Sequence, residues 1–250
     1  INLSTVVEEV DGRYVLNYAK LARIVDSAVH FLDNVIDVNK YPLAEIEEMT
    51  KGSRKIGLGV MGFADMLFKL GIPYDSDEGV ELARKVMRFI SERSREMSAQ
   101  LAEERGTFPY YDKSTLRHKG IKLRNATTTT IAPTGTISII CGTTSGIEPL
   151  FAISFVRNVM DNDELLEVHP YFKEVAIKRG FYSDQLMRKI ASHGSIQDIE
   201  EIPEDVRRVF VTAHDVSPEY HVRMQAAFQE YTDNAVSKTV NFPNSATVDD

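Results

Sequence analysis

The chain has 250 residues, of which 43% are hydrophobic and 26% are charged, a composition typical of a globular protein with one substantial core. Its net charge of −8 argues against a surface built for nucleic acid or anionic membrane, although a local dipole can still hold a small anion. Its single cysteine excludes an internal disulfide, and no apolar run is long enough to span a membrane. We therefore expect a soluble protein of the cytoplasm.

The first half of the chain is expected to be mainly helical. Apolar residues that recur at spacings of three and four predict amphipathic helices. The expected helices span Tyr14–Val38, Leu43–Met49, Phe63–Leu70 and Glu78–Arg105. Gly106 is expected to form a left-handed cap after the last of them. Residues 107–124 lack a clear period and are interpreted as a structured loop.

The second half alternates expected strands with helices. Strands are predicted for the β-branched run Thr127–Ile131 and for Phe151–Met160 and Lys238–Phe242. Helices are predicted for Leu165–Lys178, Ser183–Ser192, Glu204–Thr212 and Glu219–Asn234. This alternation predicts a helix-rich α/β fold with largely parallel pairing. Because both ends lie in or near strand-like sequence, we expect one incomplete domain over residues 1–250.

The strongest local signal is the turn Pro133-Thr134-Gly135-Thr136-Ile137-Ser138, which follows the threonine-rich strand and opens a short helix or turn. The first N–H groups of a helix have no partner within it, and the helix dipole places partial positive charge there. Gly135 lets a phosphate approach the backbone, and the neighbouring hydroxyl groups can donate further bonds. The pattern therefore indicates an anion site without any basic residue. The alternative is a capped turn with no ligand, since Ser and Thr are common caps.

A rival signal is the segment from Gly57 through Gly59 to Gly62, which matches G-x-G-x-x-G and precedes a helix. It would suggest a nicotinamide-dependent dehydrogenase, with Asp75 or Asp77 near the expected acidic position. However, a dinucleotide-binding unit needs a buried strand directly before the glycines, and polar residues 51–55 stand there instead. Close helix–strand packing is the better explanation of these glycines.

Other candidate residues are interpreted as structural. Cys141 is expected to be a buried small hydrophobe, although its place after the turn also permits a nucleophilic or redox role. The six histidines lack metal-ligand spacing, so no metal site is predicted. Asp33, Asn34 and Asp37 are expected to form a solvated face or a helix end.

Taken together, these segments resemble the catalytic subunit of ribonucleotide reductases, most closely the adenosylcobalamin-dependent (class II) type. The resemblance runs in order through the whole chain. It is carried by Ile1–Ser4, Asp33–Pro42, Arg54–Ala64, Arg124–Thr127, Ile131–Ser138, Thr144–Phe151 and Asn234–Pro243.

The resemblance implies a fold, a substrate and a cofactor. The family's fold is a ten-stranded α/β barrel, of which this chain resembles the later part. The family binds substrate phosphates at a Pro-Ser/Thr-x-Thr turn, which implies that Pro133, Thr134, Gly135, Thr136, Ile137 and Ser138 surround the phosphates of a ribonucleotide di- or triphosphate. Adenosylcobalamin would be the parent enzyme's radical source. The implied partners are the remainder of the same polypeptide and, as an open question, a second copy in a homodimer.

Some family features are missing from this sequence. The family's thiyl radical forms in an Asn-x-Cys-x-Glu pattern, which does not occur here, and Cys141 matches none of the family's redox cysteines by motif. We therefore assign no catalytic residue and expect this chain alone not to turn over. A dehydrogenase that uses Gly57, Gly59 and Gly62, and a non-catalytic scaffold, stay open as alternatives.

Overall fold

The computed structural model describes residues 1–158 and 164–248. The first half contains η1 (Leu3–Val6), β1 (Val7–Val10), β2 (Arg13–Leu16), α1 (Tyr18–Val38), α2 (Ala44–Ser53), α3 (Phe63–Leu70), α4 (Asp77–Arg105), η2 (Tyr111–Lys113) and α5 (Thr115–His118). The second half contains α6 (Gly135–Ile140), β3 (Ser154–Asn158), β4 (Glu164–Val168), α7 (Pro170–Lys178), α8 (Asp184–His193), α9 (Glu204–Val209) and α10 (Pro218–Gln229).

The predicted helices of the first half form, with one correction at the start. The first helix begins at Tyr18, where the side chain of Asn17 caps it by accepting from the Lys20 N–H. Residues 13–16 instead pair antiparallel with residues 7–10 as a hairpin, whose turn at Asp11 and Gly12 has positive φ at both residues. Gly106 also has positive φ, but its ψ of 162° is extended, so the expected left-handed cap is wrong.

In the second half, the predicted helix Leu165–Lys178 is wrong over its first residues. Residues 164–168 form β4, which pairs antiparallel with β3, and the helix α7 begins only at Pro170. Of the predicted strand Phe151–Met160, the structure assigns Ser154–Asn158 to β3, and Met160 lies outside the described residues. Residues 165–168 therefore pair across strands although their apolar spacing is typical of a helix.

The centre of the molecule is a layer of extended segments joined in parallel. Isolated bridges link Asn2 to Met61, Leu58 to Thr129 and Ile131 to Val236, so segments near residues 1–3, 56–61, 127–131 and 234–237 lie side by side. The predicted parallel pairing of Thr127–Ile131 is therefore confirmed. The last pairing lies at Val236, and the structure assigns no strand to residues 238–242, so the predicted strand Lys238–Phe242 is wrong.

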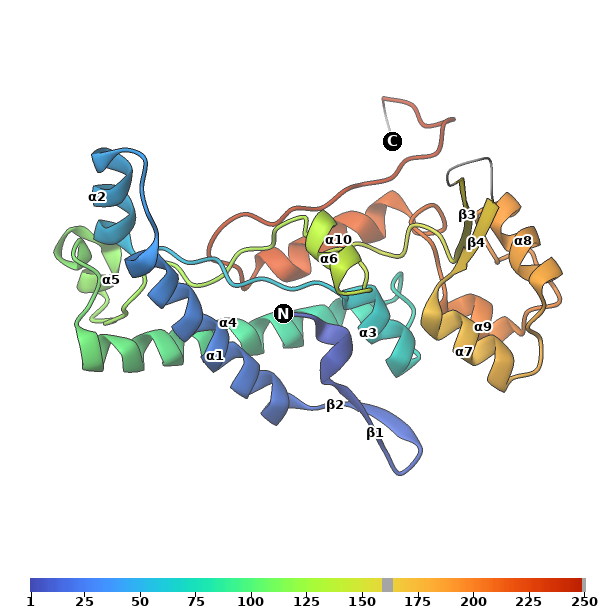
Figure 1. Cartoon of the computed structure of the whole chain (residues 1–250), viewed down its shortest axis with the longest axis horizontal. Helices are drawn as coiled ribbons and strands as arrows, with labels where there is room; N and C mark the ends of the chain where they lie inside the picture. The colour runs from blue at the N-terminus through green and yellow to red at the C-terminus, as the bar shows by residue number, and fades with distance from the viewer. Residues whose placement is uncertain (159–163, 249–250) are drawn as a thin grey trace.

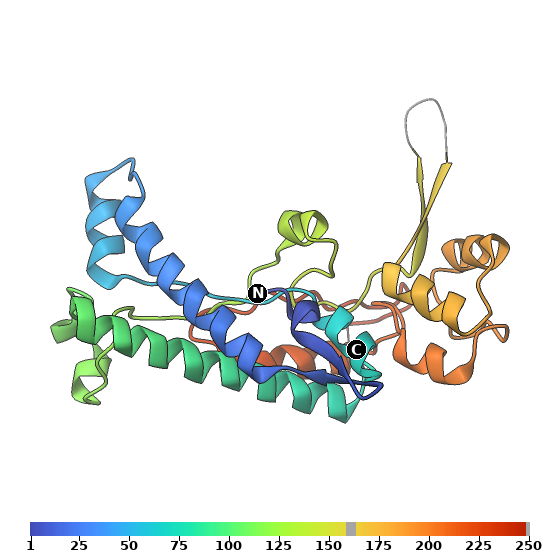
Figure 2. The same cartoon turned by 60° about the horizontal axis from the view of Figure 1, so that its bottom comes forward.

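Helices cover this layer unequally. In Figure 2, α6 stands over the middle of the extended segments, between α2 at one end and the β3–β4 hairpin at the other, whereas α4 and α10 lie on the opposite side. The long helices α1 and α4 pack against each other, and α7, α8 and α9 form a separate group at one end with the β3–β4 hairpin (Figure 1). The turn before α6 therefore opens on the less covered face of the layer.

Two hydrophobic clusters match this division. The larger cluster joins η1, α1, α3, α4 and α10 to the central layer and includes Phe63, Tyr74 and Phe228. The smaller cluster centres on Phe172, Met187 and Phe210 of the end group. Within residues 1–158 and 164–248, none of the helices combines the length and apolar character required to cross a membrane.

Candidate functional site: the turn that opens helix α6

The turn from Pro133 to Ser138 joins the end of a parallel segment to the start of α6. Ile131 is held in the layer by its N–H bond to the Ala235 carbonyl and by the bond from the Ser237 N–H to its own carbonyl. Thr134 occupies the N-cap position with φ of 56° and ψ of 22°, in the left-handed region. The chain thereby reverses direction, and α6 runs from Gly135 to Ile140.

Three backbone N–H groups at this helix start have no partner among the described residues. They belong to Gly135, Thr136 and Ile137, all of which are exposed, whereas the Ser138 N–H already donates to the Thr134 carbonyl. A Cβ added to Gly135 would meet no atom within 4 Å, so the space beside the backbone is open. Free donors that point along a helix dipole attract an anion.

The three hydroxyl groups of the turn have different surroundings. The Thr134 Oγ1 accepts a 2.7 Å bond from the Gly146 N–H, and the buried Ser138 Oγ donates to the Gly135 carbonyl and pairs with Ser145 Oγ at 2.8 Å. Thr136 is exposed, and its hydroxyl has no partner in the described part of the chain. The six predicted residues therefore come together, but Ser138 faces inward and supports the turn.

The loop that holds the turn was missed by sequence reasoning. Residues 143–146 fold back beneath α6, and the Thr143 N–H donates to the Ser138 carbonyl at 3.0 Å. The small polar sequence Thr143-Thr144-Ser145-Gly146 was the available signal, because such residues form compact loops rich in backbone bonds.

A cavity of about 400 Å³ adjoins the inner side of α6. Its lining is mainly apolar, with a few polar groups that include Thr144, whose buried hydroxyl has no partner in the described residues. The lining comprises Ser138, Ile139, Thr143, Thr144, Ser145, Glu148, Pro149, Leu150, Phe151, Ala213, Thr239 and Asn241. A larger cavity of about 740 Å³ lies elsewhere and is lined by Glu78, Glu204 and Asp205 with Arg208, which makes it unsuited to an anion.

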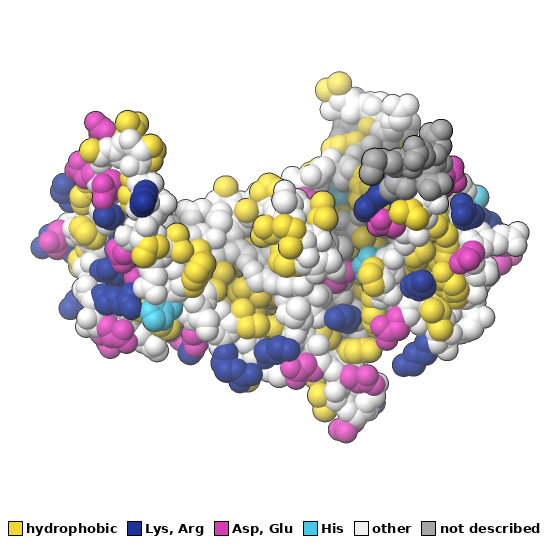
Figure 3. Space-filling model, in the orientation of Figure 1, with side chains coloured by type: hydrophobic (Ala, Val, Ile, Leu, Met, Phe, Trp, Pro, Cys, Tyr) yellow, Lys and Arg dark blue, Asp and Glu magenta, His cyan; other side chains and the backbone are white. Residues whose placement is uncertain are grey.

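The surface over α6 is apolar rather than basic. Ile137, Ile139 and Ile140 are exposed there, and Figure 3 shows hydrophobic side chains, not Lys or Arg, gathered over the middle of this face. Any attraction for an anion at this turn must therefore come from the backbone dipoles and hydroxyl groups.

Cys141 follows α6 directly and is exposed, so the expectation of a buried cysteine is wrong. The reason is that α6 buries only Ser138 and leaves its remaining side chains toward solvent. Among residues 1–158 and 164–248, no group of three or more His, Cys, Asp and Glu side chains could hold a metal ion.

The glycine-spaced segment serves strand packing. A Cβ on Gly57 would lie 2.5 Å from the Thr130 side chain, and one on Gly59 would lie 2.2 Å from the Thr130 carbonyl oxygen. These glycines therefore allow two parallel segments to approach closely. The expected close packing is confirmed, but it is packing between strands rather than between helix and strand.

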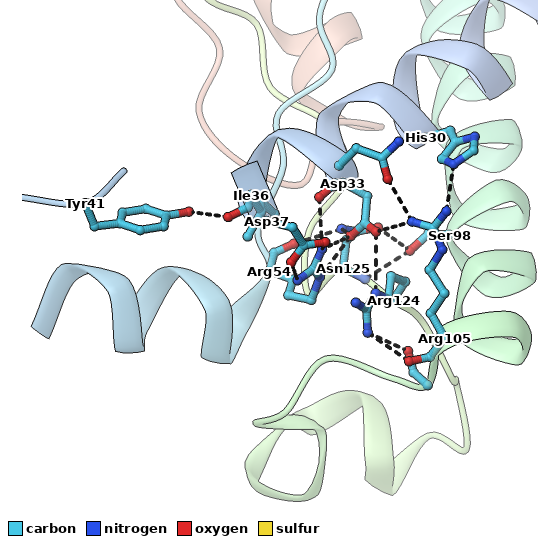
Figure 4. Close-up of polar contacts among 12 residues, drawn as sticks. His30, Asp33, Ile36, Asp37, Tyr41, Arg54, Ser98, Arg105, Arg124 and Asn125 are labelled. Carbon is cyan, nitrogen blue, oxygen red and sulfur yellow. Dashed lines mark hydrogen bonds and ion pairs between the residues drawn. The ribbon is translucent and has the colours of Figure 1, made fainter. Parts of the chain in front are cut away.

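A second polar cluster surrounds Asp33, which is 0% exposed, so its prediction as part of a solvated face is wrong. Its carboxylate accepts from Arg54 Nε at 2.9 Å, from Asn125 Nδ2 at 3.0 Å and from the side chains of Arg105 and Arg124 at longer distances (Figure 4). The exposed neighbours Asn34 and Asp37 bond to Arg105 and Arg54. All three guanidinium nitrogens of Arg54 and the Asn125 amide donate to acceptors of the chain itself, which suits a structural cluster.

Comparison with known proteins gives a consistent result. The family described as "Ribonucleotide reductase, barrel domain" matches residues 1–123 and 115–250. The vitamin B12-dependent ribonucleoside-diphosphate reductase of Thermoplasma acidophilum is 53% identical over the whole chain, and the protein of the same name from Mycobacterium tuberculosis (strain CDC 1551 / Oshkosh) is 49% identical. The chain covers 32% and 35% of these relatives, so it spans about a third of their length.

A solved structure shows the same fold. The alpha subunit of the class Id ribonucleotide reductase from Actinobacillus ureae superposes with a TM-score of 0.70 over 84% of this chain and 38% of its own chain, at 24% identity. The predicted fold, a helix-rich part of an α/β barrel, is confirmed by this likeness and by the family match.

Proposed function

The chain belongs to the ribonucleotide reductase barrel-domain family, and we propose that its turn from Pro133 to Ser138 holds the diphosphate of a ribonucleotide. The observation that carries the proposal is the set of three unpaired N–H groups of Gly135, Thr136 and Ile137 at the start of α6. The family's phosphate-binding pattern falls on the same residues.

The residues of the turn have two different roles in the proposed binding. The three N–H groups and the Thr136 hydroxyl donate to phosphate oxygens, each such bond to a charged group being worth about 1.5–3 kcal/mol. Thr134 and Ser138 hold the shape of the turn through Gly146 and Ser145. Pro133 ends the preceding segment, since its ring offers no N–H for further pairing.

The parent enzyme is proposed to reduce ribonucleotides to deoxyribonucleotides for DNA synthesis. The names of the two B12-dependent relatives support this activity and a class II radical mechanism. The turn would fix the phosphates so that a thiyl radical elsewhere in the polypeptide meets the ribose 3′ hydrogen, and such positioning can lower a barrier by several kcal/mol. This chain supplies no catalytic residue and is expected to be inactive alone.

Adenosylcobalamin is proposed as the parent enzyme's cofactor and would supply the radical. The corrin of cobalamin is broad and carries amide rather than charged side chains, whereas the cavity of about 740 Å³ is lined by charged side chains such as Glu204, Asp205 and Arg208. The smaller cavity beside α6 adjoins the proposed substrate site. Neither fits the cofactor, so we assign none of these residues to it.

The proposed partners are the ribonucleotide substrate and the remainder of the same polypeptide, which would complete the single domain whose later part is residues 1–250. A homodimer is compatible with the proposal. The net charge of −8 argues against a nucleic acid polymer or an anionic membrane as partner, and the proposed location is the cytoplasm.

Thr136→Glu in the full-length reductase tests the site. A carboxylate at this position would repel the diphosphate and occupy its space, so we expect the KM for the ribonucleotide to rise by at least about tenfold, the size of one lost charged hydrogen bond. Thr136→Ser keeps the hydroxyl and is the matched control, with a KM near that of the wild type. An unchanged KM for Thr136→Glu removes the assignment.

A further inference from the structure

The carboxylate of Asp65 is buried in the first turn of α3, outside the proposed phosphate site. Its Oδ2 accepts from the Thr143 hydroxyl at 2.5 Å and from the Thr144 N–H at 2.7 Å. Its Oδ1 accepts from His169 Nε2 at 2.7 Å. Both oxygens are therefore committed, one to the loop beneath α6 and one to the start of α7.

The loop that Asp65 holds is the same loop that supports the phosphate turn. Three bonds join them: Gly146 N–H to Thr134 Oγ1, Ser145 Oγ with Ser138 Oγ, and Thr143 N–H to the Ser138 carbonyl. The Thr144 carbonyl in turn accepts from the Gly62 N–H. One short loop thus connects the buried carboxylate with the residues that shape the anion site.

His169 fixes the orientation of the carboxylate. Its Nδ1 accepts the Phe172 N–H as the cap of α7, so the ring proton lies on Nε2 and points at Asp65. The ring also packs edge-on against Phe68. Burial alone would raise the pKa of Asp65, but the bonds from His169, Thr143 and Thr144 hold this pKa below its ordinary value, so the carboxylate stays charged.

The turn needs such a support because Thr134 has an unfavourable backbone conformation. A β-branched residue at φ of 56° is strained and persists only where its surroundings impose it. The bond between Thr134 Oγ1 and the Gly146 N–H is one such constraint, and it depends on the position of the loop.

We propose that Asp65, oriented by His169, is a positioning residue for substrate binding: through Thr143 and Thr144 it sets the loop that holds Thr134 and aims the first N–H groups of α6. The proposal rests on the function proposed above. It concerns a residue that touches no substrate.

Asp65→Asn in the full-length reductase tests the proposal. The amide cannot accept from the Thr143 hydroxyl, the Thr144 N–H and His169 together, so the loop shifts. We expect the KM for the ribonucleotide and the inhibition constant of inorganic pyrophosphate to rise together by about tenfold, the order expected for one lost charged hydrogen bond. The kcat should change far less.

Two further comparisons separate positioning from folding. Thr143→Ser keeps the hydroxyl and should have the KM of the wild type. Thr143→Val removes the bond to Asp65 and should raise the KM and the pyrophosphate inhibition constant as Asp65→Asn does. It therefore tests the same contact if Asp65→Asn folds poorly. Asp205→Asn is the matched control, because Asp205 pairs with Arg179 at the surface of the end group and contacts no part of the loop.

The outcomes distinguish the two proposals. If Asp65→Asn and Thr143→Val lower the melting temperature but leave the KM and the pyrophosphate constant unchanged while Thr136→Glu raises both, the positioning role is refuted and the phosphate site stands. If Thr136→Glu also leaves both unchanged, the phosphate site itself is refuted.

Discussion

The polar cluster around Asp33 and the turn before α6 contain similar groups used in opposite ways. Around Asp33 the side chains of Arg54, Arg105, Arg124 and Asn125 each donate to the Asp33 carboxylate. At the turn, the N–H groups of residues 135–137 meet none among the described residues. A closed set of polar partners contributes to stability, whereas an open set is available for a ligand.

The difference follows from where each region lies in the fold. The Asp33 cluster is enclosed by α1, the end of α2, α4 and the segment at residues 124–125, as Figure 4 shows. The turn lies where α6 stands over the middle of the central layer, as Figure 2 shows. Packing of several elements around Asp33 buries its carboxylate among donors, whereas the lack of such packing on one side of the turn leaves its N–H groups exposed.

The largest expected effect is a loss of stability when the central carboxylate of the Asp33 cluster is removed. Asp33→Ala removes the fully buried carboxylate that accepts from Arg54 Nε and leaves the guanidinium, which is 4% exposed, with Asp37 as its remaining acidic partner; breaking a buried ion pair in this way costs about 3–5 kcal/mol. Denaturant unfolding of the full-length enzyme should show this loss. Asp112→Ala, which breaks an exposed pair with Arg117, is the control and should change stability by less than about 1 kcal/mol. Equal losses in both variants would contradict a special role for Asp33.

A smaller effect is expected when a donor is removed from the open region. Thr136→Val deletes an exposed hydroxyl that no described residue engages, so stability should be unchanged. The KM for the ribonucleotide should rise by about tenfold, because one hydrogen bond to a charged phosphate is lost. Steady-state kinetics and thermal melting of the same preparation would measure both. A loss of stability without a change in KM would show that the Thr136 hydroxyl has a structural role and does not bind substrate.

The smallest expected effect is on the pH dependence of stability and concerns the buried His221. Its Nε2 donates to the Ala213 carbonyl and its Nδ1 accepts from Lys238, which also pairs with Glu148. Burial and the charge of Lys238, with a minor contribution from His214, lower the pKa of His221 below its ordinary 6.5, although Glu148 and the Ala213 carbonyl oppose this. The folded state therefore favours the neutral ring.

Because this pKa is lower in the folded state, the stabilisation is complete above pH 6.5 and is lost as the pH falls through the folded pKa. The melting temperature of the wild type should therefore decrease between pH 7 and pH 5, and His221→Gln should reduce that decrease. His193→Gln, at an exposed histidine, is the control and should follow the wild-type curve. A wild-type slope in His221→Gln would show that another group titrates.

Local pattern predicted well where local interactions dominate. The period of three and four placed α3 at its observed bounds and α4 within one residue of its start. It failed at residues 14–16 and 165–168, where apolar residues at similar spacings pair across hairpins instead. The Asp11-Gly12 turn was a local signal for the first hairpin, since this dipeptide favours tight turns with positive φ.

The sequence predicted the turn of the candidate site but not the residues that hold the loop beneath it. The motif at residues 133–138 located the turn with three unpaired N–H groups among the described residues, because a threonine-rich segment, a proline and a glycine act on the backbone within a few residues. Asp65 and His169 were not found, since they lie 78 and 26 residues from Thr143 in sequence and carry no shared pattern.

By itself, the amino-acid sequence determined the family and the helix-rich α/β character, and it located the turn before α6, because each depends on short-range order along the chain. Only the tertiary structure decided that Asp33 is buried, that Cys141 is exposed and that Ser138 faces inward. Burial and pairing arise when segments far apart in sequence meet, as Asp33 does with Asn125 across 92 residues. Such contacts are set by the packing of whole helices and strands, which no local pattern encodes.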